Sequence, residues 1–242
     1  MPNNNFQRGR VEYIENMWVP FSAAAGDEFI GRCVVQLSSA TVLPTANGFA
    51  RIAIDTGETD EAQIYGPLAF EVDECTLASL HCRIRTSDAD KSSIFIGWTD
   101  QLIAAEVPME DEDGTLASVA TDAIGILLEG EQDTTWQTVG VQNDVDNAQA
   151  AIGATTGDVT LPDAADSNWH SWILELTAAD SGTLKVYGED ANGQLVLAAT
   201  RTGVFRSSVC LAPVISADGR ATAYNLDVAE FGWSGGRGAF FD

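Results

Sequence analysis

Basic residues are scarce in this chain, and acidic residues are abundant. The 242 residues include 12 Lys and Arg against 36 Asp and Glu, so the formal net charge is −24, and Lys91 and Lys185 are the only lysines. Such a surface repels the phosphates of nucleic acids and anionic lipid headgroups. We therefore expect neither nucleic acid nor a membrane surface as a direct partner. The acidity suits a cationic partner or a saline medium.

The sequence also lacks export and membrane-spanning patterns. Residues 1–20 contain no basic stretch followed by an apolar run, which a secretory signal peptide requires. Aliphatic runs such as residues 126–128 are far too short to cross a bilayer. No Asn-x-Ser/Thr glycosylation site occurs. We therefore expect synthesis in the cytoplasm without classical secretion.

Cysteine and histidine are too few and too widely spaced to indicate a zinc site. The four cysteines, at positions 33, 75, 82 and 210, include no Cys-x-x-Cys pair. Each lies in or beside an apolar run, which predicts buried, reduced thiols. His81 and His170 are the only histidines. His170 is expected to face opposite to Ser171 on a strand, and we assign no catalytic role to either histidine.

Two patterns that could indicate an enzyme are incomplete. Residues 232–236 match Gly-x-Ser-x-Gly, but only eight residues follow Ser234 and none is a histidine, so the nucleophile elbow of a hydrolase is excluded. Glu71 and Asp73 are expected to share one face of a strand, as the paired carboxylates of retaining glucanases do. The second glutamate of that pattern is missing, because Cys75 and Thr76 follow. We predict no enzyme, with Glu71 and Asp73 as rim charges.

Strand patterns dominate what is present. In residues 168–177, Trp172, Leu174 and Leu176 alternate with polar residues, the two-residue period of a strand with one buried face. Asn192-Gly193 precedes a further apolar run, which is a strong hairpin signal because both residues tolerate positive φ. Similar runs recur at 11–19, 28–37, 48–55, 68–72, 79–85, 93–99, 123–129, 135–141, 169–177, 183–187, 195–200, 209–215 and 221–232.

Short strands separated by turn signals predict an all-β fold, a single antiparallel two-sheet β-sandwich of jelly-roll type. Residues 144–152 could instead form a short helix, and residues 71–80 are ambiguous by propensity. No linker or internal repeat divides the chain. We predict an N-terminal arm at residues 1–10, a β-sandwich domain at 11–234 and a C-terminal tail at 235–242.

Two acidic segments and six tryptophans are candidates for binding. Residues 106–113 and 144–146 are expected to be acidic loops, and carboxylates on loops can bind calcium. Neither segment has the spacing of an EF-hand, so a solvated charged loop is the alternative, and no cofactor is predicted. The tryptophans, at positions 18, 98, 136, 169, 172 and 233, are expected mostly in the core. Exposed members of the set would suit sugar stacking.

Residues 90–232 resemble concanavalin A-like and laminin G-like sandwich domains. The resemblance rests on Trp169-His170 opening a strand, the hairpin at Asn192-Gly193, and the runs 122–128, 212–215 and 224–231. Similar domains occur in structural proteins of tailed bacteriophages. The resemblance therefore implies a non-enzymatic virion protein, a capsid decoration or cement protein. The metal-binding acids of the family cannot be matched to positions here.

Under this hypothesis the partners are the major capsid protein and sister subunits, and the location is the virion after synthesis in the host cytoplasm. Arg8 and Arg10 in the arm could meet acidic capsid patches, and Phe240 and Phe241 are unusually apolar for a free terminus. The alternative is a lectin-like carbohydrate-binding adhesion module on a tail or fibre, with a host-surface glycan as partner.

Overall fold

β-Strands account for nearly all of the regular structure. The computed structural model describes residues 10–16, 28–30, 33–38, 40–45, 49–57, 60–66, 70–74, 77–101, 107–112, 115–220 and 222–236. An eight-stranded sheet contains, in spatial order, β17 (Leu195–Thr202), β16 (Thr183–Glu189), β15 (His170–Thr177), β8 (Leu77–Thr86), β19 (Tyr224–Gly236), β5 (Ala50–Ile54) and β4 (Thr41–Pro44), with β1 (Arg10–Asn16) beside β19.

A nine-stranded sheet forms the second layer. It contains, in order, β14 (Asp146–Ala151), β13 (Asp133–Gln142), β12 (Asp122–Glu129), β9 (Ser93–Thr99), β18 (Cys210–Asp218), β6 (Glu61–Tyr65), β3 (Cys33–Ser38) and β2 (Glu28–Ile30), with β7 (Phe70–Glu71) beside β18. The remaining elements are the hairpin β10 (Met109–Glu112) and β11 (Thr115–Ser118) and two short 3-10 helices, η1 (Ala89–Lys91) and η2 (Ala179–Ser181).

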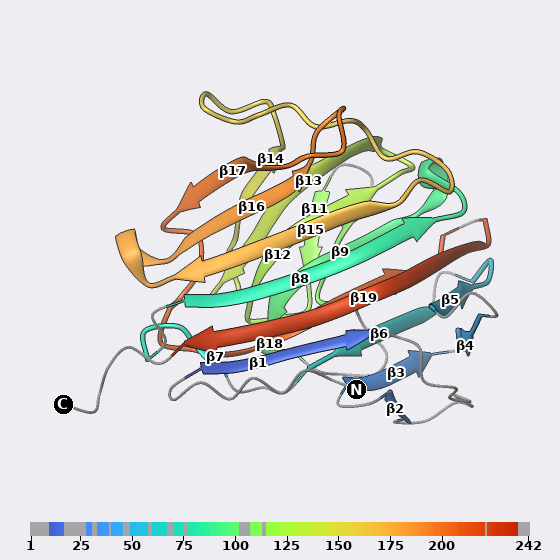
Figure 1. Ribbon diagram of the computed structural model, residues 1–242, viewed down its shortest axis with the longest axis horizontal. Helices are drawn as coiled ribbons and strands as arrows, with labels where there is room; N and C mark the ends of the chain where they lie inside the picture. The colour runs from blue at the N-terminus through green and yellow to red at the C-terminus, as the bar shows by residue number, and fades with distance from the viewer. Residues whose placement is uncertain are drawn as a thin grey trace.

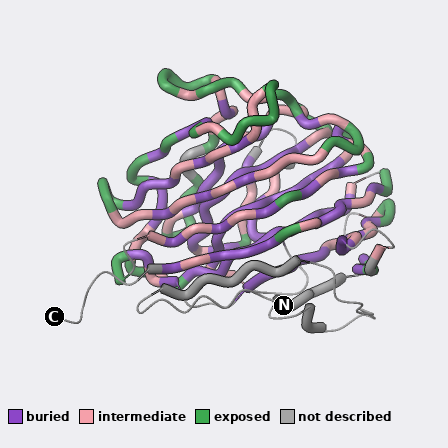
Figure 2. Tube along the Cα trace, viewed as in Figure 1, coloured by how far each residue is buried: buried purple, intermediate pink, exposed green. Residues whose placement is uncertain are grey.

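The two sheets pack face to face, as the prediction of an antiparallel sandwich requires. Figure 1 shows the eight-stranded sheet across the front of the view and the nine-stranded sheet behind it. Buried positions alternate with mostly intermediate ones along the front strands in Figure 2. In β8 the buried residues Ala78, Leu80, Cys82 and Ile84 point toward the other sheet. Trp172, Leu174 and Leu176 of β15 are buried in the same core, which confirms the predicted alternation.

The predicted hairpin before β17 is present, but its geometry depends on one glycine. Gly193 has a φ of 73°, while Asn192 is not among the residues with positive φ. The carboxylate of Asp190 accepts hydrogen bonds from the backbone N–H groups of Asn192 and Gln194, at 2.8 and 2.9 Å. These two bonds lower the pKa of Asp190. An aspartate-capped turn therefore joins β16 to β17.

Three local expectations were wrong. The acidic segment at 106–113 contributes β10 to a hairpin and is not simply a loop. Residues 144–152, considered as a helix, supply β14 instead, because hydrogen bonds to the free edge of β13 outweigh local propensity. Cys210 is exposed, whereas Cys82 is buried as expected, and burial raises the pKa of the Cys82 thiol. Cys33 and Cys75 have no described side chains.

The hairpin β10–β11 covers part of the outer face of the nine-stranded sheet. Met109 and Leu116 from the hairpin belong to a second apolar cluster with Phe95, Leu127 and Val139 of that sheet. This face of the nine-stranded sheet is therefore partly a second core, separate from the one between the sheets. Among the described residues, no helix is long and apolar enough to cross a membrane.

The first and last strands of the chain pair in the eight-stranded sheet. β1 pairs antiparallel with the C-terminal half of β19, and Arg10 lies opposite Gly236 (Figure 1). Arg10, assigned to the arm, thus already belongs to a strand, and so do residues 235 and 236 of the predicted tail. Residues 1–9 and 237–242 lie outside the described part of the chain, so the predicted boundaries stay predictions.

Candidate ligand-binding site

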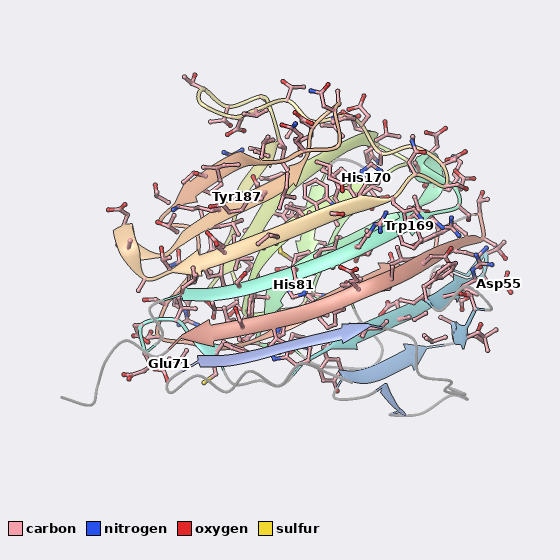
Figure 3. The ribbon with its side chains drawn as sticks, in the orientation of Figure 1. Asp55, Glu71, His81, Trp169, His170 and Tyr187 are labelled. Carbon is pink, nitrogen blue, oxygen red and sulfur yellow. The ribbon has the colours of Figure 1, made fainter. Side chains whose placement is uncertain are left out.

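Arginine and aromatic side chains gather on the outer face of the eight-stranded sheet. His170, the first residue of β15, pairs with Ile84 of β8, and this register places Trp169 beside Arg85. The Cζ atoms of Arg85 and Arg83 lie 4.7 and 5.3 Å from the centroid of the Trp169 ring. Figure 3 shows Trp169 at the end of β8 on the near face of this sheet. These distances fall within the range of cation–π contacts.

Phe49, which immediately precedes β5, completes the aromatic part of this group. Its ring meets the Trp169 ring edge-on, with centroids 5.5 Å apart, and the Arg85 guanidinium lies 5.0 Å from its centroid. Phe49 is buried, whereas Trp169 is partly exposed. We call Phe49, Arg51, Arg83, Arg85, Trp169 and Asp227 the arginine–tryptophan cluster.

One buried carboxylate anchors the cluster. Asp227 of β19 accepts a bidentate pair of hydrogen bonds from Arg51, at 2.7 and 2.9 Å, and one from Nε of Arg85 at 2.9 Å. The hydrogen bond to Asp227 raises the pKa of Arg51. The side chain of Asp227 is only 5% exposed, compared with 39% for Arg51 and 26% for Arg85. The guanidinium groups are thus fixed from below and open to solvent above.

The cluster holds more positive charge than its own acid neutralises. Arg83 is exposed and has no hydrogen-bond acceptor within the described part of the chain, and the Nη atoms of Arg85 likewise have none there. Glu230 lies opposite Arg83 in the register of β19 and β8, yet no ion pair joins them among the described residues. Among the residues whose side chains are described, three arginines therefore share one buried carboxylate and one exposed glutamate nearby.

Other arginines of the chain are paired within the fold. Arg201 makes a bidentate contact with Asp158, at 2.8 and 2.7 Å, and the contact lowers the pKa of Asp158. Arg206 binds Asp122 through two nitrogens. In a molecule with a net charge of −24, the arginine–tryptophan cluster is therefore an unusual local excess of cations.

A second charged group lies at one end of the nine-stranded sheet. Glu61, Asp218, Ser93 and Glu129 occupy one row across β6, β18, β9 and β12. Arg220 closes this row: its Nη2 lies 2.8 Å from Glu129 and 3.2 Å from the Ser93 hydroxyl, and its Nη1 contacts Asp218.

The same arginine reaches the hairpin over this sheet. Nη1 of Arg220 lies 3.4 Å from Glu110 of β10. Burial raises the pKa of Asp218 to about 8, with Glu110 and Glu61 adding to the rise against the opposing effect of Arg220. The arrangement is a buried ionic junction that ties the hairpin to the sheet, rather than an open site.

The acidic segments do not assemble a metal site in the described part of the chain, where no group of three or more His, Cys, Asp or Glu side chains is arranged to hold an ion. Glu110 points to Arg220. Asp146 accepts a hydrogen bond from the Ser118 hydroxyl at 3.0 Å. A calcium site at these loops thus finds no support in their geometry.

Most residues singled out from the sequence lie elsewhere. Arg8, Phe240 and Phe241 fall outside the described residues, and only the backbone pairing of Arg10 is defined. The expectation that Glu71 and Asp73 share a strand face was wrong, because β7 ends at Glu71 and Asp73 lies in the following turn. No paired-carboxylate geometry results.

Strand register determines which histidine and tryptophan side chains point into the core and which lie on the outer face. His170 points inward toward Trp136, with ring centroids 6.4 Å apart, and burial lowers its pKa. His81 lies on the outer face of β8 (Figure 3). Of the tryptophans with described side chains, only Trp169 is partly exposed, while those at 98, 136, 172 and 233 are buried. The sequence alone does not distinguish Trp169, because its exposure follows from the register of β15.

Comparison with known proteins shows the fold. No protein-family model matches the chain, and no curated protein matches it. Peanut lectin, solved with a nine-residue peptide, has a TM-score of 0.61 at 12% identity and covers 93% of this chain and 97% of the lectin. The exoplasmic/lumenal domain of VIP36, solved with Ca²⁺ and Man3GlcNAc, has a TM-score of 0.54 at 12% identity over 86% of this chain and 87% of that chain.

A third solved structure, of a protein of unknown function from Shewanella oneidensis MR-1, has a TM-score of 0.58 at 13% identity over 96% of this chain and 89% of that one. The chain has a lectin-like, concanavalin A-like sandwich fold. The predicted fold class is confirmed. At these identities the likeness concerns the fold alone.

Proposed function

We propose that this protein is a non-enzymatic, lectin-like carbohydrate-binding module, and that the arginine–tryptophan cluster is its sugar site. The observation that carries the proposal is Trp169, an aromatic ring left partly exposed on a sheet face and fixed by two guanidinium groups. An aromatic face can pack against the apolar face of a sugar ring, and neighbouring N–H groups can bind sugar oxygens. The fold similarity to a lectin and to a carbohydrate-bound domain supports the proposal.

The rigidity of the cluster favours binding. Arg51 and Arg85 are held by Asp227 through charge-assisted hydrogen bonds, so little side-chain entropy remains to be lost when a ligand binds. The strands that carry the cluster, β5, β8 and β19, are neighbours within one sheet. A preformed site of this kind requires no rearrangement.

A glycan array probed with the purified full-length chain tests this proposal. Binding of at least one glycan class is expected, together with a loss of roughly tenfold or more in affinity for Trp169→Ala, since truncation of a central aromatic residue in a binding site costs about 2 kcal/mol or more. Trp169→Ala should retain the far-UV spectrum of the wild type. An array without hits, or hits that Trp169→Ala leaves unchanged, would refute the assignment.

A second proposal is attachment of the module to a virus particle as a capsid decoration protein, with the major capsid protein and sister subunits as partners. The pairing of β1 with the end of β19 supports it, because this pairing places Arg10 opposite Gly236, so that the first and last described residues of the chain are neighbours. Removing residues 1–9 should abolish particle binding and preserve the fold. Unchanged binding would reject the arm, and absence of the chain from purified particles would reject the virion proposal.

A further inference from the structure

We infer that the glycan bound at the arginine–tryptophan cluster is anionic, a sugar carrying carboxylate or sulfate groups beside the ring that stacks on Trp169. This inference rests on the proposed function, since it names the ligand class of the same site. It is supported by the guanidinium N–H groups of the cluster that have no acceptor among the described residues, and by their position next to the partly exposed Trp169 ring.

The excess positive charge of the cluster favours an anionic ligand over a neutral sugar. Asp227 already receives three N–H donors, two from Arg51 and one from Arg85. The Arg83 guanidinium and the Nη atoms of Arg85 have no acceptor among the described residues. Their planar forks match the paired oxygens of a carboxylate or sulfate. A neutral sugar would leave the excess charge of this site unmatched.

The position of the donors matches a ligand with both an apolar face and a charge. Arg83 and Arg85 are two residues apart on β8, so both side chains project from the same face, and both lie against the ring of Trp169. A sugar ring packed on the exposed part of Trp169 would place a ring substituent within reach of these guanidinium groups. An acidic peptide could use the charges but has no need of the ring.

The net charge of the molecule restricts the size of the ligand. At −24 the whole chain repels polyanions and other copies of itself. Beyond a Debye length of about 8 Å at physiological salt this repulsion is screened, whereas contacts at the cluster are not. Short anionic oligosaccharides should therefore bind better than long polyanions, which would lie across the surrounding acidic surface.

Isothermal titration of the full chain with matched probes tests the inference. The probes are trigalacturonate, its methyl ester, a sulfated trisaccharide and the peptide Glu-Glu-Glu. We expect trigalacturonate, the sulfated trisaccharide or both to bind at least ten times more tightly than the methyl ester, which keeps the sugar rings and loses the charge. Comparison of the two anionic probes identifies which acid group the cluster prefers.

Two variants that remove one positive charge from the same sheet face provide the matched comparison. Arg83→Gln should lower the affinity for the anionic trisaccharide roughly tenfold or more, as expected for the loss of a charge-assisted hydrogen bond. Lys185→Gln, on β16 and away from the cluster, should leave it unchanged. Trp169→Phe should weaken the acid and its ester by similar factors.

The outcomes separate the inference from the function on which it rests. Equal affinities for the acid and its methyl ester, unaffected by Arg83→Gln, would overturn the anionic class while sugar binding stands. Binding of Glu-Glu-Glu as tight as that of trigalacturonate, insensitive to Trp169→Phe, would overturn the sugar and make the cluster an acidic-peptide site. Failure of all of these probes and of a glycan array would reject the proposed function itself.

Discussion

Arg220 is the residue whose removal should most clearly damage the fold. It binds Glu129 through two nitrogens, at 3.3 and 2.8 Å, and also contacts Asp218 and Glu110. The side chains of Glu129 and Asp218 are 1% and 2% exposed. Arg220→Met would leave buried acid groups without their cation, and such a loss costs about 3–5 kcal/mol. That is a large part of the roughly 5–15 kcal/mol by which domains are stable.

Urea denaturation of the wild type and the variant measures this cost. The midpoint should fall with little change in the slope, which indicates a loss of stability rather than a change in the unfolded state. The control is Lys91→Met, because the Lys91–Glu131 pair is 3.8 Å long and its side chains are 40% and 35% exposed. This exposed pair should contribute at most about 1 kcal/mol. If Arg220→Met costs no more than Lys91→Met, the reasoning about the buried junction fails.

Three further predictions concern single residues. Asp218 has a folded pKa of about 8, above its ordinary value of 3.8. Between these pH values only the folded state keeps the proton of Asp218, so the stability that this group contributes falls as the pH rises through that window. The free energy of unfolding, measured at pH 5, 7 and 9, should therefore fall less for Asp218→Asn than for the wild type. Gly97→Ala should lower the free energy of unfolding, measured in urea melts, by about 1–3 kcal/mol or more, because the added Cβ would lie 2.3 Å from the Ile124 carbonyl oxygen. A smaller effect would mean that β9 and β12 can separate. In native protein, maleimide labelling followed by peptide mass spectrometry should modify Cys210 and spare Cys82, and equal labelling would contradict their burial.

The strands were predictable where one face of each is buried. The alternation around Trp172 follows directly from the two-residue period, and the hairpin before β17 follows from Gly193. Strands at the edges carry weaker patterns. β14 was missed because its pairing with β13 is a tertiary effect, and the acidic strand β10 was missed because its apolar support, Met109, is a single residue in a charged segment.

The arginine–tryptophan cluster was not predictable for a different reason. Phe49, Arg83, Trp169 and Asp227 are distant in sequence and meet only because β5, β19, β8 and β15 are adjacent in one sheet. The single local signal was the spacing of Arg83 and Arg85 around the apolar Ile84. It indicates two cations on one strand face. It does not show that Trp169 lies opposite them, which depends on the pairing of His170 with Ile84.

Two-dimensional ¹H–¹⁵N NMR of the full chain during titration with a glycan that binds it tests the central claim most directly. The account predicts that the indole signal of Trp169 and the guanidinium signals of Arg83 and Arg85 shift first, with saturation at one site. Shifts confined to Tyr65 and Phe95, on the outer face of the nine-stranded sheet, with no change at Trp169, would contradict it.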